Sequence, residues 1–155
     1  LSTKIAPTAQ EARQKLESSL TSGRAAEIFG KMVSALGGPK DFMDAPRKHL
    51  RAAPIARPVF TDEEGTVSAI ATRDLGLAVI ELGGGRRRAD DKIDHSVGLD
   101  QLLGKNFRAD MNTPLCIIHA ADEAALDRAA NIVKAAYIIG NTVRELPPVL
   151  ETITA

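Results

Sequence analysis

The stretch Val67–Asp94 constrains the fold most, because a strand pattern and a helix pattern are followed at once by three glycines and three arginines. Residues 67–70 form a short run typical of a strand. A helix is expected next, with Thr72 able to cap it and Asp74 in the first turn, where the helix dipole favours negative charge. Its apolar face is expected to carry Leu75, Ala78, Val79 and Leu82.

The loop that follows this helix allows two interpretations. Flexible backbone amides next to guanidinium groups suit an anion, so a loop facing a ligand or a cleft is one of them. The other is a helix C-cap followed by solvated arginines, since glycine commonly ends helices. The loop follows a helix instead of preceding one, so it is not a nucleotide-binding glycine loop. The candidate residues are Gly83, Gly84, Gly85, Arg86 and Arg87.

Two helices are predicted near the start of the chain. Thr8 and Glu11 have the spacing of a capping box, and the helix that follows should run to about Thr21. Ser22 can cap a second helix, which Gly-Gly-Pro at 37–39 should end. The apolar stripe of this second helix is expected to be core, and it comprises Ala25, Ile28, Phe29, Met32, Val33 and Leu36.

A proline-rich, basic segment and then a change of period divide the chain. We expect a helical segment over 1–40, a linker over 41–57 with one short helical turn near Pro46, and an α+β domain over 58–155. In that domain we expect strands at 58–61 and 66–70, joined by a turn, and a central strand at 115–120. The fold class is therefore α+β, with a mixed or antiparallel sheet and packed helices.

A long final helix is predicted from its cap and its apolar face. Asp122 should cap it, and Gly140-Asn141 should end it. Residues 149–154 alternate like a closing strand. The buried face is expected to comprise Leu126, Ala129, Val133 and Ala136, with Ile132 and Tyr137 flanking.

Composition excludes several classes of function. Twenty basic and twenty acidic residues balance, so we expect neither nucleic acid nor a membrane as a partner. No apolar run approaches the roughly 20 residues of a membrane span. The single cysteine, Cys116, lies in an apolar run and is expected to be an inert, buried thiol in a cytoplasmic protein. The chain starts at Leu1 and is expected to be a portion of something larger.

The residues alone show no catalytic centre and no metal site. His49 is expected to be exposed, His119 to lie at the core edge, and His95 to bond to Asp94 or Ser96. No cluster of histidines, cysteines or carboxylates has the spacing of metal ligands. The acidic pairs at 63–64 and 90–91 lie in turns, where solvation is the simplest explanation.

The ordered succession of motifs resembles the C-terminal domain of the thymidine and pyrimidine-nucleoside phosphorylases. An upstream match covers Ser22-Gly23-Arg24-Ala25 and Phe29-Gly30-Lys31-Met32-Val33. One departure is Asn112, which stands where the family usually has a turn glycine. The main match comprises Val67-Ser68-Ala69-Ile70, Thr72-Arg73, Leu75-Gly76-Leu77-Ala78-Val79, Gly83-Gly84-Gly85-Arg86-Arg87, Ile93-Asp94, Ser96-Val97-Gly98, Pro114-Leu115, Ile118-His119-Ala120 and Asp122-Glu123.

The resemblance implies an enzyme that cleaves a pyrimidine nucleoside with phosphate as co-substrate and without a cofactor. In the family the cleft lies between an all-α domain and an α/β domain, and the residues that hold phosphate and base lie upstream of these motifs. No catalytic residue is therefore carried over, residues 1–40 correspond to the end of the α/β domain, and a homodimer would form through an N-terminal domain. The family's glycine-rich loop closes toward the cleft, which implies this role for Gly83–Arg87. Its Gly-Gly-Gly-Arg-Arg form favours a thymidine phosphorylase, and the chain alone is expected to be inactive.

Two other functions stay open. One is a carrier-like binding module, because the turn at 62–65 and the segment 110–115 resemble half-motifs of biotinyl and lipoyl carriers. Lys92 and Lys105 lack the hairpin-tip setting that such a carrier needs. The other is a non-catalytic scaffold domain.

Overall fold

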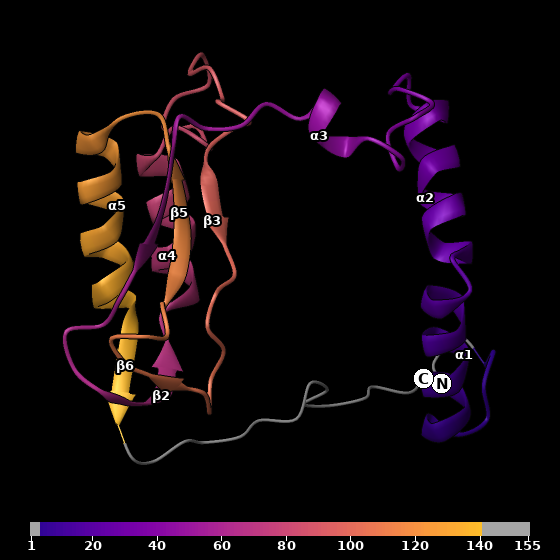
Figure 1. The fold of residues 1–155 in the computed structure, drawn as a ribbon, viewed down its shortest axis with the longest axis horizontal. Coiled ribbons are helices and arrows are strands. Elements are labelled where there is room, and N and C mark those ends of the chain that lie inside the picture. Colours follow the sequence, from indigo (N-terminus) through magenta and orange to yellow (C-terminus); the bar gives the residue numbers. More distant parts are fainter. Residues whose placement is uncertain (1–3, 141–155) are drawn as a thin grey trace. The chain divides into compact units, whose positions relative to one another are not determined.

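The computed structural model describes residues 4–140, and the chain divides into two units, the first reaching Arg51 and the second beginning at Ala52. The first unit is helical and the second contains all the strands of the described residues (Figure 1). None of the helices in the described part of the chain is both long and apolar enough to cross a membrane.

The first unit contains α1 (Ala9–Thr21), α2 (Arg24–Ala35) and the single turn α3 (Pro46–His49). The predicted cap Thr8 of α1 is confirmed, because Thr8 Oγ1 accepts a hydrogen bond of 3.2 Å from the Glu11 amide. The predicted cap of α2 is wrong. Its N-cap is Gly23 at φ +77°, not Ser22, although Ser22 Oγ accepts a hydrogen bond of 3.5 Å from the Arg24 amide.

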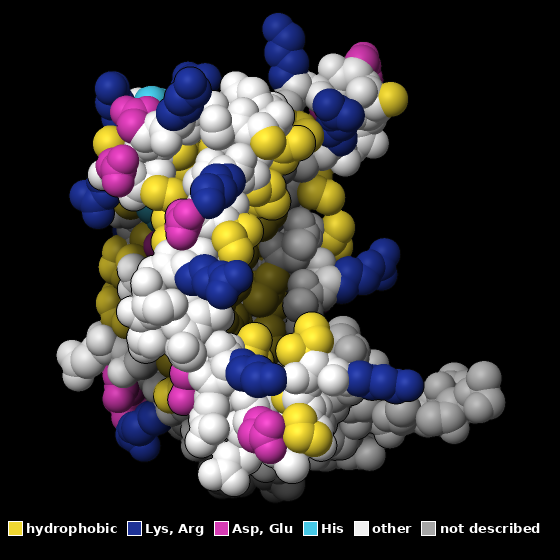
Figure 2. Space-filling view, turned by 90° about the vertical axis from the view of Figure 1, so that its right-hand side faces the viewer, with side chains coloured by type: hydrophobic (Ala, Val, Ile, Leu, Met, Phe, Trp, Pro, Cys, Tyr) yellow, Lys and Arg dark blue, Asp and Glu magenta, His cyan; other side chains and the backbone are white. Residues whose placement is uncertain are grey.

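The apolar stripe of α2 is not core in this structure, contrary to the prediction. Phe29 and Met32 are 44% and 49% exposed, and Leu36 is 81% exposed. Among the described residues of this unit, Ala6 alone is buried. Hydrophobic side chains also reach the surface drawn in Figure 2, among Lys and Arg. A helical unit of this size that buries so little apolar surface does not supply its own folding free energy.

The second unit is an α+β domain, which confirms the predicted fold class. Its strands form two antiparallel three-stranded sheets. One has the order β1-β5-β3, with β1 at Ile55–Val59, β5 at Cys116–Ala120 and β3 at Gly98–Asp100. The other has the order β4-β2-β6, with β4 at Arg108–Ala109, β2 at Gly65–Ile70 and β6 at Tyr137–Gly140.

Strand β5 is central in its sheet, as predicted, and Cys116, Ile118 and Ala120 on it are fully buried. The neighbouring strand β1 begins at Ile55, three residues before the predicted start, so it takes up the end of the expected linker. β1 is an edge strand that pairs with β5 alone, and an edge tolerates Pro58, which has no N–H to donate.

Two helices cover the core of this unit. α4 (Thr72–Glu81) and α5 (Glu123–Ala136) pack against each other, and α5 also contacts β1, β5 and β6. The predicted cap of α5 is confirmed, since Asp122 Oδ1 accepts from the Ala125 amide at 2.7 Å. The predicted cap of α4 is wrong, because Ala71 is the N-cap and Thr72 is already helical. The predicted faces are confirmed for Leu75, Ala78, Leu82, Leu126, Ala129, Val133 and Ala136, all of which are buried.

The chain after α5 turns directly into a strand, which the sequence prediction missed. The helix ends at Ala136 instead of reaching Gly140, and Tyr137–Gly140 pairs antiparallel with β2. The Ala71 amide donates to the Ala136 carbonyl at 2.8 Å, which starts the pairing. The closing strand predicted at 149–154 lies outside the described residues.

Candidate functional site

The glycine-arginine loop begins as a helix C-cap. Leu82 is the C-cap of α4, and Gly83 follows at φ +92°. The Gly83 amide donates to the Ile80 carbonyl at 3.0 Å, and the Gly84 amide donates to the Val79 carbonyl at 2.9 Å. These two bonds form a Schellman motif, which needs a left-handed residue at the position of Gly83. The capping interpretation therefore explains the first glycine.

The next two glycines are required by close approach to the helix. A Cβ atom on Gly84 would lie 2.9 Å from Val79 Cγ1, and one on Gly85 would lie 2.7 Å from Ile80 Cγ1. The Asp94 amide then donates to the Gly83 carbonyl at 2.9 Å, so the two ends of the loop are bonded together. The base of the loop is thus fixed to the end of α4.

The tip of the loop is held by its own carboxylate. Asp91 Oδ2 accepts hydrogen bonds of 2.9 Å from the amides of both Arg87 and Arg88. These two bonds, followed by the charges of Arg87 and Arg86, hold the pKa of Asp91 below its usual range despite an opposing desolvation effect. The expectation that Asp91 is simply solvated is wrong. The two amides are already satisfied, so an anion would meet guanidinium groups here instead of these backbone donors.

All three arginines of the loop are exposed, and Arg87 also forms an ion pair. Arg87 forms an ion pair with Glu81 at the end of α4, and Arg128 Nε on α5 lies 3.7 Å from the other carboxylate oxygen of Glu81. The side chains of Arg86 and Arg88 are exposed. An open hollow of about 570 Å³ lies beside this group, and its lining includes Glu81, Arg87, Lys92 and Arg128. The sequence analysis missed Glu81 and Arg128, because no local pattern connects α5 with the loop.

The histidines are structural or exposed. His119 Nε2 lies 4.0 Å from Asp100 Oδ2 at the core edge, as expected. The prediction that His49 is exposed is wrong, because its side chain is largely buried and its Nε2 lies 2.8 Å from Asp41 Oδ1. His95 is exposed. Within residues 4–140, no three His, Cys, Asp or Glu side chains lie close enough together to hold a metal ion.

Cys116 is fully buried on β5, as expected from its apolar neighbours. Burial raises the pKa of its thiol to about 11. The group is therefore a neutral thiol at physiological pH and not a nucleophilic thiolate.

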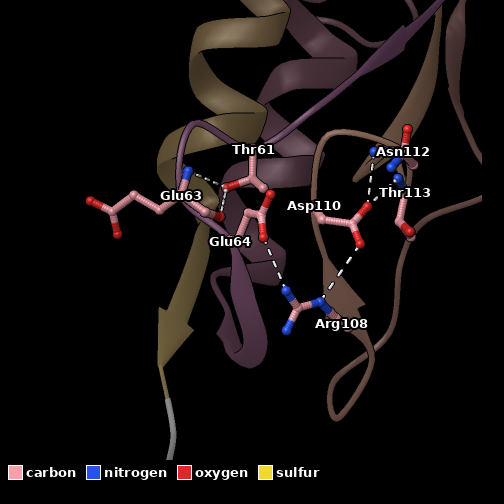
Figure 3. Close-up of polar contacts among 7 residues, drawn as sticks. All are labelled: Thr61, Glu63, Glu64, Arg108, Asp110, Asn112 and Thr113. Carbon is pink, nitrogen blue, oxygen red and sulfur yellow. Dashed lines mark hydrogen bonds and ion pairs between the residues drawn. The ribbon is translucent and has the colours of Figure 1, made fainter.

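A second polar group joins the turn before β2 to the segment around β4 (Figure 3). Arg108 Nη2 donates to Glu64 Oε2 at 3.0 Å, and Arg108 Nε lies 3.7 Å from Asp110 Oδ2. Asp110 Oδ1 accepts from the amides of Asn112 and Thr113, both at 2.8 Å. Glu64 is therefore paired instead of merely solvated. Asp110 holds the turn, and Asn112 does not have the positive φ of a turn glycine. The group ties the two segments together and brings no reactive pair of groups together.

The two candidate carrier lysines do not lie at a hairpin tip. Lys105 is in the turn between β3 and β4, and these strands belong to different sheets. Lys92 lies in the glycine-arginine loop, directly after Asp91. A carrier presents its lysine on a tight turn between paired strands, so this geometry does not support the carrier interpretation.

A comparison with protein families places these features in a known context. The family model described as "Pyrimidine nucleoside phosphorylase C-terminal domain" matches residues 66–140. The matched segment runs from β2 to the end of β6, and it contains the glycine-arginine loop and both helices of the second unit.

Proposed function

Because residues 66–140 belong to the pyrimidine nucleoside phosphorylase family as its C-terminal domain, we propose that this chain serves in the phosphorolysis of thymidine. The reaction cleaves the nucleoside with phosphate and gives thymine and 2-deoxyribose 1-phosphate. The family match carries the proposal. The preference for thymidine over uridine is supported by the Gly-Gly-Gly-Arg-Arg sequence at 83–87.

The catalytic groups of this reaction belong to a part of the enzyme other than the described residues. In residues 4–140, Cys116 is a buried neutral thiol. His49 lies in the first unit and His119 in the second, and each is next to a carboxylate of its own unit. The exposed apolar stripe of α2 supports a place for these helices at the end of a larger α/β domain. The chain alone therefore binds no nucleoside productively and has no phosphorolytic activity.

The glycine-arginine loop is the part of this chain that contributes to the site. Its base is fixed to α4, its backbone amides at the tip are taken by Asp91, and Arg86 is exposed. The loop therefore acts through its guanidinium groups, which bind phosphate well. A loop that closes over bound substrates also excludes water from the reaction.

The remaining features of the proposal follow the family. The intact enzyme is a cytoplasmic homodimer that assembles through an N-terminal domain. Phosphate is a substrate and supplies the attacking oxygen, so the reaction needs no cofactor and no metal ion.

Phosphorolysis assays with a mass determination test the proposal. The intact mass of the source protein is measured first, and the protein and the 155-residue chain are then assayed with thymidine and with uridine. We expect a mass well above 16.5 kDa and turnover of thymidine by the intact protein, and none by the chain alone. Turnover by the chain alone would refute the assignment of catalysis to other segments.

Arginine variants of the intact enzyme test the loop. Arg86→Ala and Arg87→Ala should lower kcat/KM and leave the unfolding midpoint nearly unchanged, since both side chains are exposed. Arg73→Ala, which removes an exposed arginine from α4, is the matched control. Unchanged kinetics in both loop variants would mean that the loop is only a helix cap.

Unchanged kinetics would favour the scaffold function. One structural observation supports that function. Every glycine of the loop has a structural reason in the capping of α4, from the positive φ of Gly83 to the close approaches of Gly84 and Gly85.

A further inference from the structure

The carboxylate of Glu81 connects three segments that are far apart in the sequence. It lies at the end of α4 and is 27% exposed. One oxygen pairs with Arg87 from the tip of the loop, and the other lies 3.7 Å from Arg128 Nε on α5. Two cations thus share one half-buried anion.

The contacts of the loop differ in what they join. The bonds of Gly83, Gly84 and Asp94 fasten the base of the loop to α4. The bonds of Asp91 are internal to the tip. The Arg87–Glu81 ion pair joins the tip to the body of the domain. Releasing this pair would free the guanidinium of Arg87 and leave the base of the loop in place.

We infer that Glu81 is a latch, which holds Arg87 against α4 until an anionic ligand carrying a phosphate group replaces it as the partner of Arg87. Phosphate and carboxylate both accept paired hydrogen bonds from a guanidinium group, so they compete for the same donor. The inference rests on the proposed function, because it takes phosphate as the ligand of the loop. Glu81 is a positioning residue in this scheme.

Arg128 makes the exchange possible. A half-buried carboxylate that loses its partner is left with an unfavourable uncompensated charge. Arg128 already lies within ion-pair distance of Glu81, so it remains as the partner of this carboxylate when Arg87 leaves. The latched and released states therefore both keep Glu81 paired.

The latch is expected to be weak. Arg87 and Arg128 are 60% and 57% exposed, and ion pairs of this kind shift an equilibrium by about two- to five-fold. Removing the latch should strengthen the binding of phosphate to the loop by about the same factor.

The test uses NMR spectroscopy of the full 155-residue chain, with inorganic phosphate as the probe. Relaxation of the Arg87 Nε–H group reports whether its side chain is held, and a phosphate titration gives a Kd from the shifts of the loop. Glu81→Gln should mobilise the Arg87 side chain and lower the Kd for phosphate two- to five-fold. Asp90→Asn is the matched control, because it removes an exposed carboxylate from the same loop without touching this pair.

Each outcome decides one step. An Arg87 side chain as mobile in the wild type as in Glu81→Gln would refute the latch, whatever reaction the intact enzyme performs. Equal effects of Glu81→Gln and Asp90→Asn on the Kd would reduce the effect to net charge and refute the competition. Loop resonances that do not respond to phosphate would also refute the competition. The relaxation readout needs no turnover, so a failed thymidine assay would overturn the proposed function without deciding the latch.

Discussion

Two glycine-to-alanine variants in and after α4 test the structural basis of the loop. Gly76 lies in the middle of the helix and is exposed, and Gly83 lies just after it at φ +92°. Apart from the flanking residues and the backbone of the helix itself, no atom lies within 4 Å of a Cβ added at either position, so neither alanine causes a steric clash. The two variants therefore differ only in the backbone conformation of the substituted residue, which is helical at Gly76 and left-handed at Gly83.

The expected effects have opposite signs. Alanine in an exposed helix interior is more favourable than glycine by about 0.8–1 kcal/mol, so Gly76→Ala should stabilise the domain. At a left-handed position alanine costs about 1–2 kcal/mol, of which about 0.4–1 kcal/mol is offset because alanine restricts the unfolded chain. Gly83→Ala should therefore destabilise by about 0.5–1 kcal/mol. The difference between the two variants should be about 1.3–2 kcal/mol.

Urea unfolding measured by tyrosine fluorescence is the assay. The chain has one tyrosine and no tryptophan, and Tyr137 is buried in the second unit, so its emission reports on that unit alone. The midpoint should rise for Gly76→Ala and fall for Gly83→Ala, with the slope m unchanged in both. In a thermal scan, the same difference corresponds to roughly 5–16 °C between the two variants.

The comparison would refute the capping argument if both variants raised the midpoint. Both substitutions restrict the unfolded chain alike, so a common stabilisation would mean that Gly83 is not held in the left-handed conformation. The first glycine of the loop would then need an explanation other than the Schellman motif.

Two further predictions concern single polar groups. Tyr137→Phe removes the hydroxyl that lies 3.0 and 3.1 Å from the carbonyls of Leu103 and Leu115, and should lower the free energy of unfolding by about 1–2 kcal/mol in circular dichroism experiments. Burial, more than the neighbouring Cys116, raises the pKa of Tyr137 to about 12, above the unfolded value of about 10. Its contribution is therefore complete below pH 10 and is lost as the pH rises through 12, and the variant should lack this part of the alkaline loss. Folding lowers the pKa of Asp91, so its contribution to stability is lost as the pH falls and not as the pH rises. The bonds of the loop tip should therefore persist above the usual aspartate pKa and break only as the pH falls below it. Amide shifts of the tip that titrate at the usual aspartate midpoint would contradict this prediction.

Local patterns determined much of the fold in advance. The caps Thr8 and Asp122 and the buried face of α4 follow from spacings of three or four residues, and the structure has them as predicted. The class of domain and the central place of β5 also followed from the sequence. Such features depend on neighbours in the chain, and for these the sequence contains both partners.

Strand β6 shows where local patterns fail. The apolar residues after Ala136 continue the helical pattern of α5, but the backbone turns extended at Tyr137 and pairs with β2. About seventy residues separate the two strands, so helix propensity was overridden by a hydrogen-bonding partner that local reasoning does not identify. The same holds for Glu64 and Arg108, whose ion pair joins positions 44 apart.

The sequence by itself located the candidate loop, because three glycines and three arginines in succession end a helix and concentrate positive charge at one place. Only the tertiary structure decided the state of that loop. Packing of α4 against α5 brings Arg128 to Glu81, which already pairs with Arg87. Ion pairing depends on distance in space and not on separation along the chain, so the groups that hold the loop became visible only when the helices were in place.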